Sequence, residues 1–587
     1  MKTIAHDMVI RGGLVIDGSG SPAFRADVAI NGGRITAIGP IEGSGKEEID
    51  AADCLVTPGF VDVHTHYDGQ ATWEHTLAPS SGHGVTTVVT GNCGVGFAPV
   101  RPSDHQVLIK VMEGVEDIPE VVMAEGISWN WETFPDYLDV LSVREFDIDV
   151  ATQIPHSPLR VYVMGQRGAD HEPSTPEDRV AMAKLVTEAV QAGAIGVSTS
   201  RSPGHRLKNG KLAPSIDSAD EEILALASGL KEAGAGVFQI ITNASGNPAE
   251  EISLVRKLAE TSQRPVSFTL LQVPRAPEDW RISLKHVEQA NADGLAIRGQ
   301  VFPRPVGVLL GLDLSLNPFL TRLSYRAIEK LPLAERVAIL RDPAFKAKLL
   351  AEVPIPDPQP MLNELCAQVN EMFVLDDRAE YTPPADKLIC NLAASAGVSA
   401  ESLAYDLLLG DEGKAILYLP GANYVGNTLN AVREMMASPY TILGLGDGGA
   451  HYGLICDASY PTFMLTHWVR DASPEQRFPI EWAISELSRK PAEAVGLMDR
   501  GLLKPGMKAD VNVINLDRLR LSAPRTAYDL PSGGRRLQQR AEGYVATVVS
   551  GMVTYRNGKA TGALPGRLVR RQQAQQQSVQ GREGVRP

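Results

Sequence analysis

The chain has 587 residues, of which 43% are hydrophobic and 21% are charged, and its formal net charge at pH 7 is −14. This composition is typical of a globular protein, and the length exceeds what one ordinary hydrophobic core requires. A net negative field does not attract nucleic acid or an anionic membrane surface, so we expect neither as a partner.

Cysteine usage and the N-terminal sequence bear on the compartment. The five cysteines are scattered, odd in number and without CxxC spacing, which favours a reducing compartment over a disulfide framework. The N-terminus, MKTIAHDMVIRGG, lacks the continuous apolar core of a signal peptide, and no window approaches the ~20 apolar residues of a membrane span. We therefore expect a cytoplasmic protein.

Both ends of the chain have the texture of short β-strands. Residues 1–57 contain alternating runs broken by Gly and Asn, and the NGG at 31–33 predicts a hairpin. Residues 500–565 show the same pattern. We predict a small β-sandwich domain built from 1–57 and 500–565.

A short apolar run at 55–63, LVTPGFVDV, predicts a buried strand that ends just before His64 and His66. Residues two apart in a strand point to the same face, so the two imidazoles should project side by side. Neutral imidazole is the commonest protein ligand for transition metals. The pair therefore predicts half of a metal site.

Between the two ends, apolar strands alternate with helical segments, which indicates βα units around a parallel sheet. Helical segments include AMAKLVTEAVQAG and ADEEILALASGLKEAG. The predicted strand ends are GVTTVVTGNCG, VATQIPH, GAIGVSTS, GAGVFQIIT, RPVSFTLLQ and YTILGLGDGGAH. We predict an α/β fold with a (β/α)8 TIM-type barrel over 58–499.

Two segments exceed what a barrel needs, and the C-terminal end differs from both. Residues 101–145 are rich in aromatic residues, among them Trp129, Trp131 and Phe134, which could line an acyl pocket or form the core of a lid. Residues 302–438 are mostly helical and Pro-rich, and we predict a helical insertion there. The Gln-rich residues 566–587 predict a disordered tail.

Four segments, PGFVDVHTHYD, GVTTVVTGNCGVGFAP, LGLGDGGAH and KPGMKADVNVIN, carry a family resemblance. They resemble the amidohydrolase superfamily, and within it the D-aminoacylase-type (N-acyl-D-amino-acid deacylase) enzymes. The resemblance covers most of the chain and is weaker in its middle. It implies a distorted (β/α)8 barrel with a terminal β-sandwich and a zinc site at the carboxyl ends of the strands.

The resemblance also implies roles for four residues. His64, His66 and Cys93 match zinc ligands, and Asp447 matches an aspartate that touches the metal and acts as general base. A thiolate and neutral imidazoles suit zinc, and a carboxylate beside the metal can move the proton of water. Taken alone, Cys93 would be a small buried hydrophobe and Asp447 a turn residue, but together the four predict a metal site.

The chain departs from the family pattern where two further histidine ligands are expected. The best-matching positions hold Ile241 and Phe268, which cannot bind metal. One interpretation is a single zinc held by the four residues above, with water completing the site. Another is a barrel that has lost its metal. In a third, remote histidines substitute, the candidates being His83, His156, His171, His205 and His451.

Two weaker site predictions concern the substrate. Arg201 follows the strand GAIGVSTS, where a guanidinium could hold a carboxylate. His451 lies four residues after Asp447 and could reach the site. The ordinary alternative for Arg201 is a surface arginine.

The predicted function is that of an amidohydrolase with one zinc ion that cleaves N-acyl (D-)amino acids or related acyl-amides. The alternatives are a cyclic amidase or deaminase on the same fold, or a metal-free, non-catalytic barrel. The expected partner is a small acyl-amide substrate, and a homo-oligomer is possible.

Overall fold

A computed structural model describes residues 4–571, and a parallel eight-stranded sheet forms its centre. Its strands are β6 (Phe60–Asp62), β7 (Val85–Thr90), β8 (Asp149–Pro155), β9 (Gly196–Ser200), β10 (Val237–Ile241), β11 (Val266–Thr269), β12 (Ile297–Val301) and β16 (Thr441–Leu443). They follow one another in the order β16–β12–β11–β10–β9–β8–β7–β6. The predicted (β/α)8 barrel is thereby confirmed.

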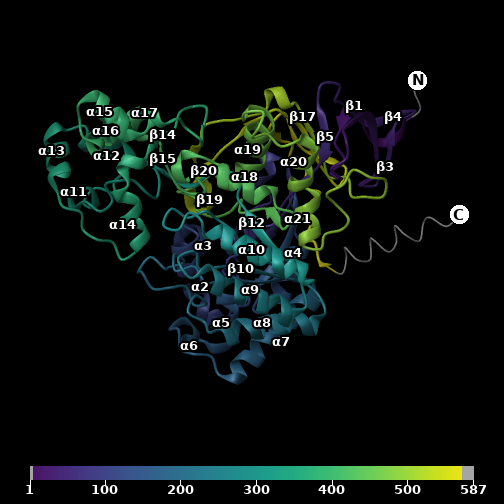
Figure 1. Cartoon of the computed structure of the whole chain (residues 1–587), viewed down its shortest axis with the longest axis horizontal. Helices are drawn as coiled ribbons and strands as arrows, with labels where there is room; N and C mark the ends of the chain where they lie inside the picture. Colours follow the sequence, from purple (N-terminus) through teal and green to yellow (C-terminus); the bar gives the residue numbers. More distant parts are fainter. Residues whose placement is uncertain (1–3, 572–587) are drawn as a thin grey trace.

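Helices cover the outside of this barrel (Figure 1). They include α5 (His156–Met164), α7 (Pro176–Ala192), α8 (Asp220–Ala233), α9 (Pro248–Ser262), α10 (Asp279–Ala292), α18 (Asn430–Ala437), α20 (Ile480–Leu487) and α21 (Arg489–Ala494). Local sequence fixes their ends: a capping box of Thr175 and Asp178 begins α7, and the left-handed Gly234 ends α8.

The apolar run 55–63 forms two strands rather than the single one expected. β5 (Leu55–Pro58) pairs with strands of the terminal sheet, whereas β6 begins the barrel. Gly59 lies between the two strands. Only glycine fits there, because a Cβ would lie 2.2 Å from Thr86 Oγ1. The chain therefore changes sheets at a residue that must be small.

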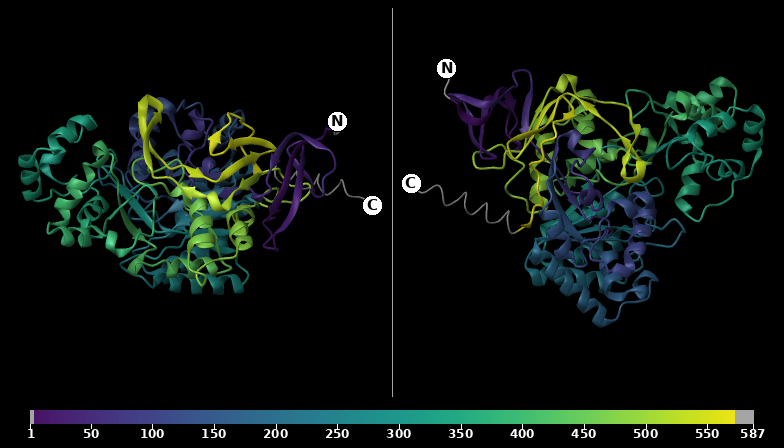
Figure 2. Two further views of the ribbon diagram at one scale, coloured as in Figure 1. Left: turned by 90° about the horizontal axis from the view of Figure 1, so that it is seen from above. Right: turned by 180° about the vertical axis from the view of Figure 1, so that it is seen from behind.

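Strands from both chain ends share one nine-stranded sheet, seen in Figure 2 as purple and yellow arrows side by side. Its strands are β1 (Ile4–Val15), β2 (Phe24–Asn31), β3 (Arg34–Gly39), β4 (Ser44–Asp50), β5, β17 (Val511–Ile514), β22 (Tyr544–Val549), β23 (Met552–Arg556) and β24 (Lys559–Ala560). The hairpin of β19 (Arg525–Leu530) and β20 (Gly534–Gln538) is outside this sheet. Leu537 N instead donates to Tyr452 O, next to His451.

The predicted insertion forms a lobe with a hydrophobic core of its own, at the upper left of Figure 1. A three-stranded sheet, β13–β15–β14, joins it to the barrel. The elements are β13 (Val306–Leu310), α11 (Leu323–Arg326), α12 (Leu333–Leu340), α13 (Pro343–Ala351), α14 (Pro360–Ala367), β14 (Phe373–Val374), α15 (Ile389–Ala396), α16 (Ala400–Leu408), α17 (Gly410–Gly413) and β15 (Leu417–Ala422). The last residues of the predicted insertion, in α18, belong to the barrel instead.

A second helical segment follows β7 and consists of α2 (His105–Val115), α3 (Glu120–Gly126) and α4 (Phe134–Ser142). Trp131 and Phe134 are buried there, and Trp131 Nε1 donates to Phe97 O. Trp129 stacks on His105. The aromatic run therefore packs as a core of this segment.

The end of the described chain differs from the predicted tail. Residues 566–569 lie along the start of β8, where Val569 N donates to Val150 O, and Leu568 and Val569 are buried. Their apolar side chains explain why they pack rather than extend into solvent. The rest of the predicted tail, 572–587, lies outside the described residues.

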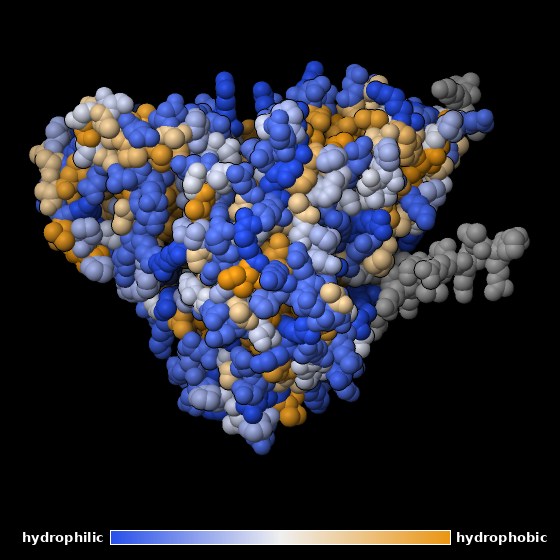
Figure 3. Space-filling model, viewed as in Figure 1, coloured by the Kyte–Doolittle hydropathy of each residue, from blue (hydrophilic) through white to orange (hydrophobic). Residues whose placement is uncertain are grey.

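Hydrophilic residues cover most of the face shown in Figure 3, with hydrophobic residues in small groups between them. Among residues 4–571 there is no helix with the length and apolar character needed to cross a bilayer.

Candidate metal centre

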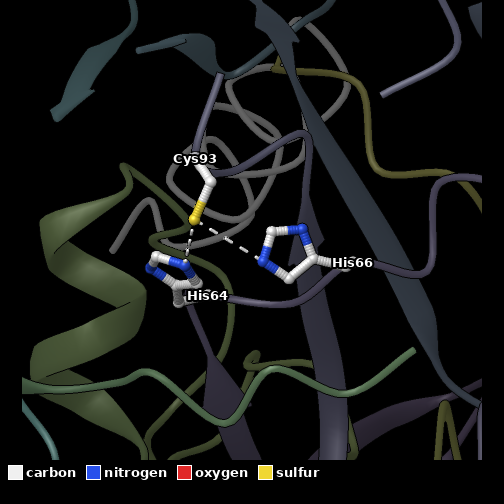
Figure 4. A group of neighbouring side chains, drawn as sticks. All are labelled: His64, His66 and Cys93. Carbon is white, nitrogen blue, oxygen red and sulfur yellow. Dashed lines mark hydrogen bonds between the residues drawn. The ribbon is translucent and has the colours of Figure 1, made fainter. Parts of the chain in front are cut away.

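His64 and His66 lie just beyond the carboxyl end of β6 and point toward Cys93 (Figure 4). His64 Nε2 is 3.2 Å and His66 Nε2 is 3.7 Å from Cys93 Sγ. All three side chains are buried, and their ligand atoms lie within 4.8 Å of one another. The structure thus brings together three of the four predicted ligands from two adjacent strands.

Cys93 occupies a strained turn after β7. Its φ is +56°, in the left-handed region that residues other than glycine seldom adopt. Glycine is required two residues earlier, because a Cβ on Gly91 would lie 2.1 Å from Gln153 O. Strain of this kind concentrates at functional sites, and here it turns the thiol toward the histidines.

Asp447 follows β16, the strand at the other end of the barrel sheet from β6, and its carboxylate lies beside the two imidazoles. Its Oδ1 is 3.5 Å from His64 Nε2 and 3.6 Å from His66 Nε2. The side chain is 22% exposed, whereas those of the two histidines are 1% exposed. Asp447 is therefore the member of the group that an incoming substrate could touch.

Gln300, on β12, fixes the orientation of His64. His64 Nδ1 donates to Gln300 Oε1 at 2.8 Å, since an amide oxygen can only accept, and Gln300 Nε2 donates to Ser267 Oγ at 3.0 Å. This bond leaves the Nε2 lone pair of His64 directed at Cys93 and Asp447. Gln300 was not predicted as a site residue, because the polar sequence of β12, IRGQV, does not have the apolar pattern of a buried strand.

Burial and neighbouring charges shift the pKa values of His64, His66 and Cys93 in different directions. Burial lowers the pKa of His64 to about 4, so its imidazole is neutral at pH 7. Burial would also lower the pKa of His66, but the negative charge of Glu116 raises it well above the ordinary value. Burial raises the pKa of the Cys93 thiol to about 12. Cys93 would therefore become a thiolate ligand only when a cation replaces its proton.

Burial would raise the pKa of Asp447, but a hydrogen bond with His66 and the positive charge of that imidazole hold it below its usual value. Its carboxylate is ionised at neutral pH and can accept a proton.

Glu116, just after α2, is a second site residue that was not predicted from the sequence. Its side chain is 2% exposed, and its oxygens lie 3.6 Å from His66 Nδ1 and 3.4 Å from His451 Nε2. His451, predicted as a weak substrate contact, is 27% exposed and borders the site. Helical periodicity gave no sign that a carboxylate from this segment would enter the barrel.

The two positions matched to the absent histidines differ in the structure. Ile241 is half-buried at the carboxyl end of β10, whereas Phe268 is buried in the hydrophobic core. Because Ser267 faces Gln300 in the barrel interior, alternation along β11 places Thr269, not Phe268, on that inner face. Both barrel-facing residues, Ile241 and Thr269, are unsuited to holding zinc.

Three of the remote histidines have other partners. His83 bonds Thr462 and Gln539, His156 bonds Thr199 and Glu222, and His171 bonds Leu212.

His205 is close enough to the site to interact electrostatically with His66, Asp447 and His451. Burial and the charges of His451 and His66 lower its pKa to about 3, and its Nδ1 is buried without a hydrogen-bond partner.

Arg201 already has two carboxylate partners. Its Nη1 lies 2.9 Å from Asp220 and its Nε lies 3.3 Å from Glu251. The role of Arg201 in binding a substrate carboxylate stays a prediction.

The donor set fits a zinc ion. Zn–N distances of ~2.0–2.1 Å and a Zn–S distance of ~2.3 Å in a tetrahedral site imply N–S separations of about 3.6 Å. The two observed separations between imidazole Nε2 and Cys93 Sγ, 3.2 and 3.7 Å, lie on either side of that value. Only small adjustments would be needed for these residues to hold the ion.

Comparison with known proteins agrees with the geometry. Residues 47–555 match the model of the amidohydrolase family. The D-aminoacylase of Alcaligenes xylosoxydans xylosoxydans is 26% identical over 572 residues, which cover 96% of this chain and 98% of that protein. The two chains are therefore similar over nearly their whole lengths.

Solved structures share the fold. A D-aminoacylase crystal structure superposes with a TM-score of 0.64 at 23% identity, covering 97% of this chain and 100% of the other. An N-acyl-D-glutamate deacylase from Bordetella bronchiseptica, in complex with zinc and a phosphonate inhibitor, gives a TM-score of 0.64 at 22% identity, covering 96% and 99%. The chain belongs to the amidohydrolase family, as a D-aminoacylase-like hydrolase of carbon–nitrogen bonds other than peptide bonds.

Proposed function

We propose that the protein hydrolyses the amide bond of N-acyl (D-)amino acids or related acyl-amides with one bound zinc ion. The observation that carries this proposal is the convergence of His64, His66 and Cys93 within 4.8 Å, with Asp447 beside both imidazoles. A relative named D-aminoacylase, similar over nearly its whole length, supports the substrate class.

His64, His66 and Cys93 would hold the ion, with Asp447 at its open side. Zinc, when bound, would supply a Lewis acid that acidifies water and polarises the scissile carbonyl. Asp447 would accept the proton of the attacking water and deliver it to the leaving amine nitrogen. Its side chain is 22% exposed, so this carboxylate is more accessible to a substrate than the buried imidazoles are.

The barrel positions of β10 and β11 support the proposal of a single ion. Ile241 and Thr269 face the interior where further ligands would be needed, and neither is a zinc ligand of the kind that completes a second site. The predicted cytoplasmic location and homo-oligomeric state stay predictions.

Elemental analysis of purified protein, combined with a substrate panel, tests the proposal. We expect about one zinc per chain, lost in the double variant His64→Ala, His66→Ala. N-acetyl D- and L-amino acids should be assayed beside hydantoins. Hydrolysis of hydantoins without any linear amide would favour the cyclic amidase, and a protein that binds no zinc would refute the proposal.

A further inference from the structure

A buried carboxylate, Glu116, contacts two histidines at the candidate metal centre, His66 and His451. Glu116 belongs to the segment after β7, the strand that leads to Cys93, whereas His451 follows β16 and Asp447. Besides the contacts of its carboxylate with both imidazoles, Glu116 O accepts a backbone hydrogen bond of 2.5 Å from His451 N. The two loops are therefore joined by main chain and side chain at the same residue.

Burial of this carboxylate requires compensation. Removing an ionised group from water costs several kcal/mol unless polar or charged partners replace the solvent. Both oxygens of Glu116 face imidazole nitrogens, and His66 Nδ1 is buried without another hydrogen-bond partner. The carboxylate and the unpartnered ring nitrogen are thus complementary and lie just beyond hydrogen-bonding distance.

We propose that Glu116 is a positioning residue, which keeps His66 Nε2 directed at Cys93 and Asp447 and holds His451 at the exposed border of the candidate metal centre. This inference rests on the proposed function. A carboxylate behind a ligating imidazole fixes the ring and increases its basicity. Glu116 supplies this partner to His66, as the neutral amide of Gln300 does to His64.

The two histidines would then depend on Glu116 in different ways. His66 Nε2 faces Cys93 and Asp447, so loss of the carboxylate weakens metal binding. His451 is the more exposed of the two, so loss of its partner acts on substrate binding. One residue therefore controls both the affinity for zinc and the Michaelis constant.

Zinc affinity measured by competition with a chromophoric chelator tests this role. Glu116→Gln preserves size and removes the charge, and we expect its zinc dissociation constant to rise about 10–100-fold. Glu116→Asp keeps the charge and should recover part of that loss. Glu113→Gln, on α2, is the matched control, since Glu113 pairs with Lys208 away from the ligands, and it should bind zinc as the wild type does.

A second variant separates the effect of Glu116 on zinc binding, through His66, from its effect on substrate binding, through His451. His451→Asn should leave the zinc dissociation constant within about twofold of wild type, while KM rises more than kcat falls. Thermal unfolding of the metal-free proteins controls for general destabilisation, which Glu116→Asp would not repair.

Two results would overturn the proposal in distinguishable ways. Wild-type protein that binds no zinc would refute the proposed function and the role of Glu116 together. Wild-type protein that binds zinc, with Glu116→Gln binding it equally well, would refute only the role of Glu116.

Discussion

The amide nitrogen of Asp447 donates a hydrogen bond of 3.0 Å to the carbonyl oxygen of His64. A second bond, 2.7 Å long, runs from His66 N to Gly448 O. These bonds join the segments that follow β6 and β16, the first and last strands of the barrel sheet. The two bonds that join the ends of the barrel sheet therefore also bring Asp447 to the side of His64 and His66.

Substitution of Gly446 by alanine tests whether the contact between the segments that follow β6 and β16 positions the site. A Cβ at Gly446 would lie 1.9 Å from Asp62 Oδ2, and Asp62 Oδ1 accepts from His64 N. Because displacements of ~1 Å can reduce rates about 100-fold, we expect kcat/KM of Gly446→Ala to fall by that order. Gly410→Ala is the control, since its nearest neighbour would be 3.5 Å away. Equal kcat/KM in both variants would contradict the role of this contact.

Two substitutions of Cys93 separate its backbone strain from its role as a ligand. Glycine adopts a φ of +56° without strain, so Cys93→Gly should unfold at a temperature no lower than the metal-free wild type. Cys93→Ser retains the strain and lacks the thiolate. Both should lose most of their zinc, as measured by elemental analysis. Full zinc occupancy in Cys93→Gly would show that Cys93 is not a ligand.

The orientation of His64 depends on Gln300. In Gln300→Leu the buried Nδ1 of His64 has no acceptor, so we expect the zinc dissociation constant to rise about tenfold or more. Ser267→Ala removes only the next hydrogen bond and should have a smaller effect. Chelator competition measures both. The reverse order of effects would mean that Gln300 acts through the strand rather than through His64.

Strand periodicity was enough to predict that His64 and His66 share a face, and the apolar runs predicted seven of the eight barrel strands, all but β12. It could not predict Glu116 or Gln300. Glu116 follows an ordinary amphipathic helix, and only the packing of α2 against the barrel brings it to His66. Gln300 lies on a strand too polar to be recognised. Residues that orient ligands come from distant segments, and no local pattern marks them.

A buried charge cluster at the amino ends of the barrel strands predicts a stability effect. Arg500 is 3% exposed and pairs with Asp149 at 2.5 Å and with Asp499 at 2.9 Å. Arg500→Met removes the positive charge that balances the buried carboxylates of Asp149 and Asp499. We therefore expect the free energy of unfolding to fall by about 3–5 kcal/mol. Urea unfolding measures this loss.

The control for this cluster is Arg520→Met, in an exposed pair with Glu542. We expect a change of about 0–1 kcal/mol there. A similarly small change in Arg500→Met would indicate that its carboxylate neighbours find other partners.

Glu222 predicts a pH dependence of stability. Burial alone would raise its pKa, but hydrogen bonds from His156 and Arg160 lower it to about 2 from an ordinary value of 4.5. A carboxyl with a lowered pKa in the folded state stabilises the fold above pH 4.5, and this contribution is lost as the pH falls toward 2. The free energy of unfolding of the wild type should exceed that of Glu222→Gln by about 1 kcal/mol less at pH 4 than at pH 7. Urea unfolding at pH 7 and pH 4 measures the change, with the exposed neighbour Glu221→Gln as control. A constant difference between wild type and Glu222→Gln would show that Glu222 does not titrate in this range.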